Sequence, residues 1–105
     1  MDARIVDDME RYDAIVIGGG AAGLSAALML GRARRRTLVL DAGSPRNRFA
    51  AHMHGVLGHD GIDPAELLRR GREEVAAYGV SVRPGAAVRV DEDSDDLVVA
   101  LSDDA

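Results

Sequence analysis

Three glycines near the start of the chain constrain its fold more than any other feature. Gly18, Gly20 and Gly23 have the spacing G-x-G-x-x-G and directly follow residues 12–17, Y-D-A-I-V-I. A short β-branched run of this kind is typical of a strand buried on both faces of a parallel sheet. In a turn with this spacing the first glycine permits the tight bend, the second lets another group approach the backbone, and the third lets a helix touch the strand. The segment therefore predicts a strand, a glycine turn and a helix in succession.

The residues after the turn support a helix and then a second strand. From Ala22 onward small and apolar side chains recur at helical spacing, at Leu24, Ala27, Leu28 and Gly31. Residues 37–40, T-L-V-L, form a second strand of the buried type, and Asp41 follows at its carboxyl end. Apolar residues make up 47% of the chain and aromatic residues only 3%, a mixture that favours close packing of helices on a sheet. The fold class is therefore α/β, with a Rossmann-like βαβ unit.

The second half predicts a loop, a helix, a third strand and a hairpin. Residues 42–62 show no period, and a loop of this length inside a domain is typical of a functional segment. Asp63-Pro64-Ala65-Glu66 has the order of a helix N-cap, and Gly79 is placed to end that helix. Its inward stripe is expected at Leu67, Gly71, Val75 and Tyr78, with the charged residues 69, 70 and 72–74 in water. Residues 80–82 predict a third parallel strand, and residues 87–91 and 97–101 a C-terminal β-hairpin around the acidic turn 92–96.

The glycine turn and Asp41 together predict a dinucleotide site. A helix that opens at Ala21 and Ala22 directs free N–H groups and the positive end of its dipole at a pyrophosphate, so no lysine is needed. Asp41 follows the first glycine by 23 residues and is placed to accept hydrogen bonds from both hydroxyls of an adenosine ribose, while repelling a 2′-phosphate. This favours FAD or NAD over NADP. The alternative role for Asp41 is that of a turn cap before Ala42-Gly43.

Charge and composition exclude several other functions. A net charge of −5 argues against a nucleic-acid binder, and the one dense basic run, residues 32–36, is interpreted as a solvated corner rather than a phosphate or partner site. The chain has no cysteine, so these residues hold no disulfide, thiolate metal site or redox dithiol. Residues 1–11 are charged and are interpreted as a flexible leader before a domain at residues 12–105. With no long apolar run, we expect no membrane span and a cytoplasmic protein.

These residues also resemble a known family. The runs Y-D-A-I-V-I-G-G-G-A-A-G-L-S-A-A, L-V-L-D-A-G-S-P-R-N-R-F and H-M-H-G-V-L-G-H-D-G-I-D-P-A-E-L are similar to the start of a thioredoxin reductase-like NAD(P)/FAD-dependent oxidoreductase. The similarity covers residues 12–101. The glycine motif is shared with many flavin families, whereas the second and third runs are more specific to this one.

The resemblance implies a set of FAD contacts. These are Gly18, Gly20, Ala21, Ala22, Gly23, Asp41, Ala42, Arg46 and Asn47, with the adenine near Ala87. Members of the family continue with more FAD-binding chain and an NAD(P)H domain that often carries a CxxC, so this chain is expected to be truncated before that domain. Two departures stand out. Asp41 replaces the more usual glutamate, and Gly55 stands where asparagine is common, which leaves the flavin-side contact of the loop open.

The histidines of the loop admit two interpretations. His52, His54 and His59-Asp60 have the residue types of a metal site, but they lack a carboxylate at helical spacing and lie in a glycine-rich loop. Loop packing or hydrogen bonding beside the flavin is favoured, and no metal site is predicted. One hypothesis has His54 polarising the flavin or a substrate. Met29 and Met53 are assigned to packing.

The resulting functional prediction is the FAD-binding part of an oxidoreductase that passes hydride from NADPH or NADH to FAD and then to a disulfide or other small-molecule acceptor. No catalytic residue is predicted within the chain, and the chain alone is expected to be inactive. Two alternatives remain: the nucleotide-binding domain of an NAD-dependent dehydrogenase without flavin, and a non-catalytic nucleotide-binding remnant. The open sheet edge of a partial domain also makes a homodimer one possible assembly.

Overall fold

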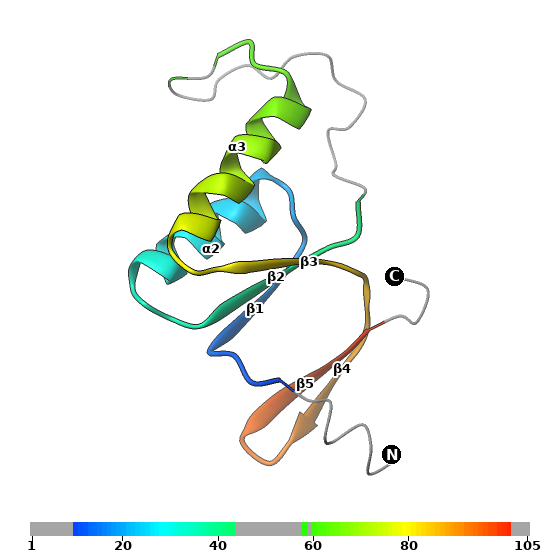
Figure 1. Cartoon of the computed structure of the whole chain (residues 1–105). Coiled ribbons are helices and arrows are strands. Elements are labelled where there is room, and N and C mark those ends of the chain that lie inside the picture. The colour runs from blue at the N-terminus through cyan, green and yellow to red at the C-terminus, as the bar shows by residue number, and fades with distance from the viewer. Residues whose placement is uncertain (1–9, 44–57, 59, 102–105) are drawn as a thin grey trace.

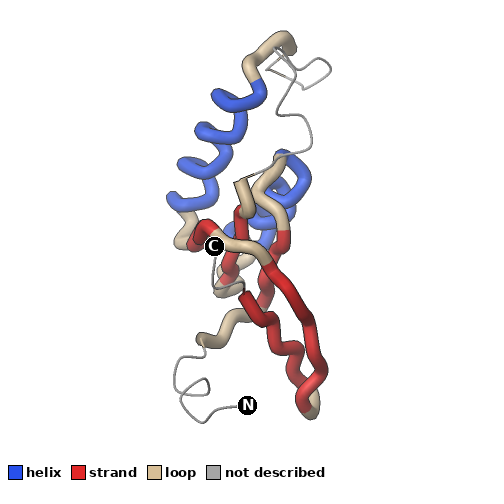
Figure 2. Tube along the Cα trace, turned by 90° about the vertical axis from the view of Figure 1, so that its right-hand side faces the viewer, coloured by secondary structure: helices blue, strands red, loops and turns tan. Residues whose placement is uncertain are grey.

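A computed structural model describes residues 10–43, 58 and 60–101 of the chain. Its elements, in order, are β1 (Ala14–Ile17), α2 (Ala21–Arg32), β2 (Thr37–Asp41), α3 (Pro64–Ala77), β3 (Ser81–Pro84), β4 (Ala87–Asp93) and β5 (Asp96–Leu101). The first five form two layers, in which both helices cover one face of a sheet and the β4–β5 hairpin projects away from them (Figures 1 and 2). This is the predicted α/β architecture with a C-terminal hairpin.

The sheet is parallel, with β2 between β1 and β3. Ala14 is in register with Thr37 and Ile17 with Leu40 across the first pair, and Leu38 is in register with Ser81 across the second. All three strands therefore end at the same edge of the sheet. Because α2 and α3 join parallel strands, both are crossover helices, and they lie on the same side of the sheet (Figure 1).

The core lies between this sheet and the two helices. One valine of each strand faces the helices, namely Val16, Val39 and Val82. The helices and the turn before β3 supply the rest of the cluster, Leu24, Ala27, Leu28, Leu68, Val75 and Val80. Each fully buried leucine or valine side chain contributes about 1.5–3 kcal/mol relative to an exposed one. The core thus fixes the helices over the sheet and, with them, the turn between β1 and α2.

Two glycines allow the helices to approach their neighbours closely. A Cβ at Gly31 of α2 would lie 2.8 Å from Cγ2 of Val80, and a Cβ at Gly71 of α3 would lie 3.0 Å from Cδ1 of Leu24. Both positions were predicted to face inward. Close packing of this kind depends on small residues, because an added methyl group has no space in a dense interior.

The inward stripe of α3 differs from the predicted one. Pro64, Leu68 and Val75 are buried, whereas Leu67 is only half-buried and Tyr78 is 52% exposed. Leu68 lies four residues after Pro64 and seven before Val75, so these three side chains lie on the same face of the helix. Tyr78 is the C-cap, where the chain leaves the helix. Arg72, expected in water, is half-buried. The predicted stripe was therefore wrong at Leu67 and Tyr78.

Two further burial predictions were wrong. β1 was expected to be buried on both faces, yet its residues are half-buried and Ile17 is 56% exposed. The reason is that β1 lies at one edge of the sheet, whereas the central β2 is buried from Thr37 to Leu40 as predicted. Met29 was assigned to packing but is 61% exposed on the outer side of α2.

The ends of α3 follow the predicted signals. The carboxylate of Asp63 accepts a hydrogen bond from the amide of Ala65 at 3.2 Å, with Pro64 in the first turn. Glu66 does not reach back to close a capping box; its carboxylate instead binds Arg69 and Arg70. Gly79 has a φ of +81°, the left-handed conformation that ends a helix at low cost for glycine. The cap and the stop were thus predicted correctly.

The hairpin is longer and its turn tighter than predicted. β4 and β5 pair from Ala87 opposite Leu101 to Asp93 opposite Asp96, so the acidic residues 91–93 belong to the strand.

Two residues that precede β1 in the sequence form ion pairs with later parts of the chain. Glu10 pairs with Arg83 at 2.8 Å, and Arg11 pairs with Asp96 at 3.0 Å. Hydrogen bonds from Tyr12 and from Arg83 hold the pKa of the Glu10 carboxyl below its ordinary value. The boundary between leader and domain at residue 11 stays a prediction.

Candidate functional site

The candidate site lies where β1 and β2 end. The amide of Gly18, the first residue after β1, donates to the carbonyl of Leu40 in β2 at 2.8 Å. Gly18 has a φ of +120°, a backbone conformation that residues other than glycine rarely adopt. A Cβ at Gly23 would lie 2.0 Å from the carbonyl oxygen of Gly18, so the helix can turn back over the strand only with glycine there. Gly18 and Gly23 therefore make the turn, as predicted.

The N-terminus of α2 is open. Gly20 is the N-cap, no side chain caps the helix, and its first turn contains no acidic residue. The first helical amide to donate along the backbone is that of Leu24, to the carbonyl of Gly20 at 2.9 Å. Within the described residues nothing accepts from the amides of Ala21, Ala22 and Gly23. The positive end of the helix dipole and these amides are thus available to an anion.

The space in front of these amides is also open. A Cβ added at Gly18 or Gly20 would meet no heavy atom within 4 Å. Ala21 and Ala22 are exposed, so the first two residues of the helix bring only methyl groups to the opening. A pyrophosphate needs this combination of bare amides, small side chains and free space. The residues present therefore fit the phosphates of a dinucleotide.

Asp41 stands beside this opening at the end of β2 and is half-exposed. Its Oδ1 accepts a hydrogen bond from the amide of Gly43 at 2.9 Å, so the alternative role of turn cap is present in the structure. Within the described residues Asp41 forms no ion pair, and Oδ2 has no hydrogen-bond partner. One oxygen therefore caps the turn, while the other remains able to accept a hydrogen bond from a ribose hydroxyl.

The structure brings together only part of the predicted contact set. Gly18, Gly20, Gly23 and Asp41 share the carboxyl edge of the sheet, with Ala42 exposed beside them. The amide of Gly85, two residues before Ala87, donates to the carbonyl of Asp41 at 2.9 Å, which joins the end of β3 to the same edge. Arg46, Asn47, Met53 and the three histidines lie outside the described residues, so their predicted roles stay predictions.

One residue of the site was missed. Gly19 is buried, and a Cβ there would lie 2.6 Å from Cγ of Asp41. The signal in the sequence was the unbroken run Gly18-Gly19-Gly20, in which the motif accounts for only two glycines. The extra glycine is needed where the Asp41 side chain packs against the turn.

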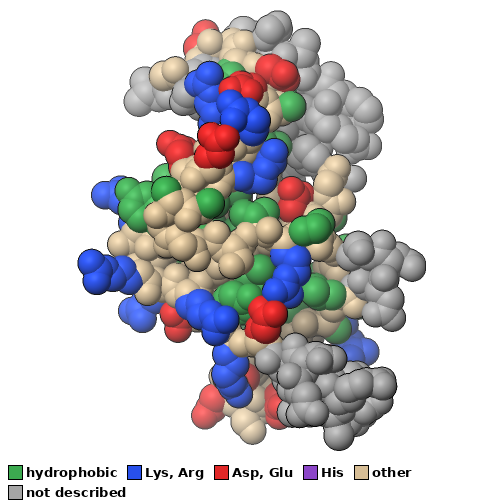
Figure 3. All heavy atoms as spheres, in the orientation of Figure 1, with side chains coloured by type: hydrophobic (Ala, Val, Ile, Leu, Met, Phe, Trp, Pro, Cys, Tyr) green, Lys and Arg blue, Asp and Glu red, His purple; other side chains and the backbone are tan. Residues whose placement is uncertain are grey.

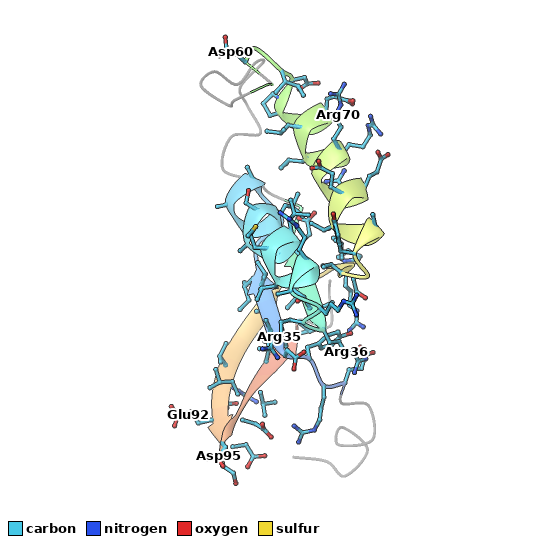
Figure 4. The ribbon with its side chains drawn as sticks, turned by 90° about the vertical axis from the view of Figure 1, so that its left-hand side faces the viewer. Arg35, Arg36, Asp60, Arg70, Glu92 and Asp95 are labelled. Carbon is cyan, nitrogen blue, oxygen red and sulfur yellow. The ribbon has the colours of Figure 1, made fainter. Side chains whose placement is uncertain are left out.

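The basic run lies far from this site. Arg32, Arg34, Arg35 and Arg36 line a surface hollow of about 580 Å³ together with Tyr78 and Gly79. Figure 4 shows Arg35 and Arg36 beside the C-terminal end of α2, and Figure 3 shows basic side chains projecting from that part of the surface. Both helices end here, and cations stabilise helix C-termini. The guanidinium of Arg36 also lies 4.7 Å from the centre of the Tyr12 ring. These contacts account for the run without a ligand.

Both described helices, of 12 and 14 residues, are shorter than a membrane span requires.

Comparison with known proteins agrees with the geometry. Residues 13–87 match the family model described as FAD binding domain. This stretch contains the glycine turn, Asp41 and the long loop, and it ends at Ala87.

Several of the relatives are named thioredoxin reductases, and these proteins are much longer than this chain. The chain is 47% identical over 68 residues to "Probable thioredoxin reductase" of Arthroderma benhamiae, covering 65% of the chain and 17% of that protein. It is 42% identical over 97 residues to "Thioredoxin reductase sirT" of Leptosphaeria maculans, covering 83% of the chain and 28% of that protein. Among solved structures, the oxidoreductase from Agrobacterium tumefaciens superposes with a TM-score of 0.82 at 41% identity, covering 91% of this chain and 32% of that one. The chain thus spans less than a third of each of these proteins.

Proposed function

We propose that this chain, which belongs to the family of FAD binding domains, holds the adenosine and pyrophosphate half of FAD in an NAD(P)H-dependent flavin oxidoreductase. Its similarity to thioredoxin reductases, in sequence and in fold, supports an N-terminal FAD-binding segment of such an enzyme. The observation that carries the proposal is the open N-terminus of α2, with bare amides facing free space. No other opening among the described residues pairs such amides with a carboxylate at a neighbouring strand end.

The residues of the chain divide the binding task. The amides of Ala21, Ala22 and Gly23 bind the phosphates, and glycine at position 20 leaves room for them. Asp41 accepts from the ribose and, by its charge, disfavours a 2′-phosphate. FAD, when bound, supplies the hydride-accepting chemistry, while this chain binds and orients its adenosine half. Roles for Ala42, Arg46, Asn47 and Ala87 in the same site belong to this proposal.

The activity of the whole protein is a wider proposal. With FAD bound, the whole protein would transfer two electrons from NAD(P)H to a disulfide or another small-molecule acceptor, with protons supplied by solvent. Two of the relatives reported above are named thioredoxin reductases, which supports this direction of electron flow. A cytoplasmic location for the whole protein belongs to the same proposal. A homodimer is proposed because β1 and β3 are both edge strands.

The alternative of an NAD-dependent dehydrogenase has less support. Residues 13–87 match a FAD domain, and this stretch includes the long loop, which a nicotinamide site does not need. The alternative of a non-catalytic remnant differs in one measurable respect: it retains no flavin even in excess FAD.

Titration of the 105-residue chain with FAD tests the proposal. We expect a saturable change in flavin fluorescence, competition by ADP, and about tenfold or more weaker competition by 2′-phospho-ADP, because the Asp41 carboxylate repels a second negative charge at the ribose. A tenfold difference in affinity corresponds to about 1.4 kcal/mol. NAD⁺ that competes as well as ADP while FAD fails to bind would favour the dehydrogenase. Absence of binding by all of these ligands would favour the remnant.

A further inference from the structure

Gly19 and Asp41 are packed against each other more tightly than any side chain at position 19 permits. A Cβ at Gly19 would lie 2.6 Å from Cγ, 2.8 Å from Cβ and 2.9 Å from Oδ2 of Asp41. Real Cβ atoms do not make contacts this short. Because the contact involves Cβ of Asp41 as well as the carboxylate, rotation of the carboxylate alone does not relieve it. The bare Cα of Gly19 therefore forms one wall of the space that Asp41 occupies.

The second restraint on Asp41 is the turn after β2. The amide of Gly43 donates to Oδ1 at 2.9 Å, and this bond restrains the orientation of the carboxylate. The amide of Gly85 holds the Asp41 carbonyl at 2.9 Å, which anchors its backbone to the end of β3. Main chain and side chain of Asp41 are thus both held, and Oδ2 alone has no hydrogen-bond partner within the described residues.

We propose that Gly19 is a positioning residue for the adenosine ribose. With the Gly43 amide it holds the Asp41 carboxylate in one orientation, so that Oδ2 is aligned for a ribose hydroxyl before the ligand arrives. This inference rests on the proposed function and deepens it, because it assigns the selectivity of the site to a residue that does not itself touch the ribose. Preorganised acceptors cost less ordering entropy on binding than mobile ones.

The same packing explains why the acid at the end of β2 is aspartate, which has a short side chain. Aspartate places its carboxylate close to its own backbone, and a carboxylate that close to β2 requires a neighbour without a Cβ. Gly19 meets this requirement. Any larger residue at position 19 therefore displaces Asp41, its hydrogen bond from Gly43, or the glycine turn.

A stability cycle without ligand tests the contact. The variants are Gly19→Ala, Asp41→Gly and the double variant, compared by urea denaturation of the 105-residue chain. We expect Gly19→Ala to lower the denaturation midpoint in the wild-type background and to have little effect in the Asp41→Gly background, where the clashing side chain is gone. Equal losses in both backgrounds would contradict the contact, because the alanine would then act through something other than Asp41.

A ligand cycle tests the positioning role, using ADP and 2′,3′-dideoxy-ADP as probes. In the wild type we expect ADP to bind about tenfold or more tightly than its dideoxy analogue, because hydrogen bonds to a charged acceptor are worth about 1.5–3 kcal/mol. In Gly19→Ala we expect the dissociation constant of the dideoxy analogue divided by that of ADP to fall toward 1, because the variant loses affinity mainly for ADP. A uniform loss of affinity for both probes would indicate damage to the phosphate turn alone and would overturn the proposal.

The two failures are distinguishable. If the wild type binds neither FAD nor ADP, the proposed function fails, and the positioning role falls with it even when the stability cycle reveals the contact. If the wild type discriminates between the probes and Gly19→Ala keeps the same ratio, the function stands and only the role of Gly19 is wrong.

Discussion

At the scale of single residues, the glycines of the turn between β1 and α2 have different roles. Gly23 supports the fold, since a Cβ there would lie 2.0 Å from the carbonyl oxygen of Gly18 and 3.2 Å from Cγ1 of Val16. Gly20 has a φ of −78° and no heavy atom within 4 Å of its Cβ position, so the folded chain itself accepts a side chain there. The motif combines a structural requirement at one end with a binding requirement in its middle.

This difference predicts opposite outcomes for two alanine variants. Gly23→Ala is expected to destabilise the chain by at least about 1–3 kcal/mol, the usual cost of overpacking, because the clash is with backbone. Gly20→Ala is expected to lower the free energy of unfolding by no more than about 1 kcal/mol, because alanine is a poorer N-cap than glycine. It is expected to weaken FAD binding about tenfold or more, since its methyl group occupies space needed by the pyrophosphate. Urea denaturation and FAD titration measure the two effects. A stable Gly23→Ala variant, or a Gly20→Ala variant with full affinity, would contradict the assignment.

The sequence alone predicted the site at the level of spacing. Gly18, Gly20, Gly23 and Asp41 were recognisable because the turn requires fixed intervals between strand, glycine and acid. Gly19 was not, because its constraint comes from Asp41, which is 22 residues away in the sequence and meets it only after β1 and β2 pair. Contacts of this kind depend on the folded sheet. The run of three glycines reveals an extra glycine, but it does not reveal which side chain requires it.

At the scale of elements, α3 begins with a cap whose energy can be measured. Asp63 accepts from the amide of Ala65 and stands before Pro64. Replacing Asp63 with alanine is expected to lower the free energy of unfolding by about 0.5–2 kcal/mol, the usual value of an N-cap. Glu74→Ala, an exposed change on the same helix, serves as the control and is expected to shift stability by less than about 0.5 kcal/mol. Equal effects of the two changes in chemical denaturation would show that the cap contributes nothing specific.

The first turn of α3 also predicts a pH dependence. Hydrogen bonds from Arg69 and then Arg70 lower the pKa of Glu66 from 4.5 to about 2. A carboxyl whose folded pKa is depressed contributes stability above its unfolded pKa and loses it as pH falls through the folded value. The stabilisation by Glu66 is therefore complete above about pH 4.5 and disappears toward pH 2.

The variant Glu66→Gln isolates this effect from other titrating groups. We expect the wild type to melt at a higher temperature than Glu66→Gln at pH 6, and the difference to shrink toward zero near pH 2. Because the ion pairs are exposed, the difference is also expected to decrease with added salt. A difference in melting temperature that stays constant across this pH range would rule out the charge of Glu66 as its source.

For the helices and strands, the sequence predicted their order and type better than it predicted which of their side chains are buried. Helices, strands and the hairpin appear in the expected order because capping residues, glycine stops and β-branched runs act locally. The facing of α3 was misplaced because Leu67 and Leu68 are adjacent and only contact with Leu24 and the sheet selects between them. The burial of β1 was overestimated because an apolar run does not reveal whether its strand lies at the edge or the centre of the sheet.

At the scale of the whole molecule, the described chain consists of two parts that differ in stability. The three-stranded sheet and its helices share one core, whereas β4 and β5 form a separate sheet in which each strand pairs only with the other. On one face of the hairpin Val88, Val90 and Leu97 are exposed. Its ion pair to the rest of the described chain, between Arg11 and Asp96, is also exposed and contributes little. An isolated two-stranded hairpin is marginally stable in water.

Amide hydrogen exchange should therefore separate the two parts of the chain. The amides of β2 are expected to exchange slowest, because this strand is buried and paired on both sides, so that they open only when the whole core unfolds. Amides of β4 and β5 are expected to exchange about tenfold or more faster through local opening of the hairpin, which leaves the core intact. Destabilising the core with Gly23→Ala should accelerate exchange in β2 while leaving the hairpin nearly unchanged, since its opening does not depend on that core. Equal protection of β2 and the hairpin, falling together in the variant, would instead mean that the two parts unfold as one cooperative unit.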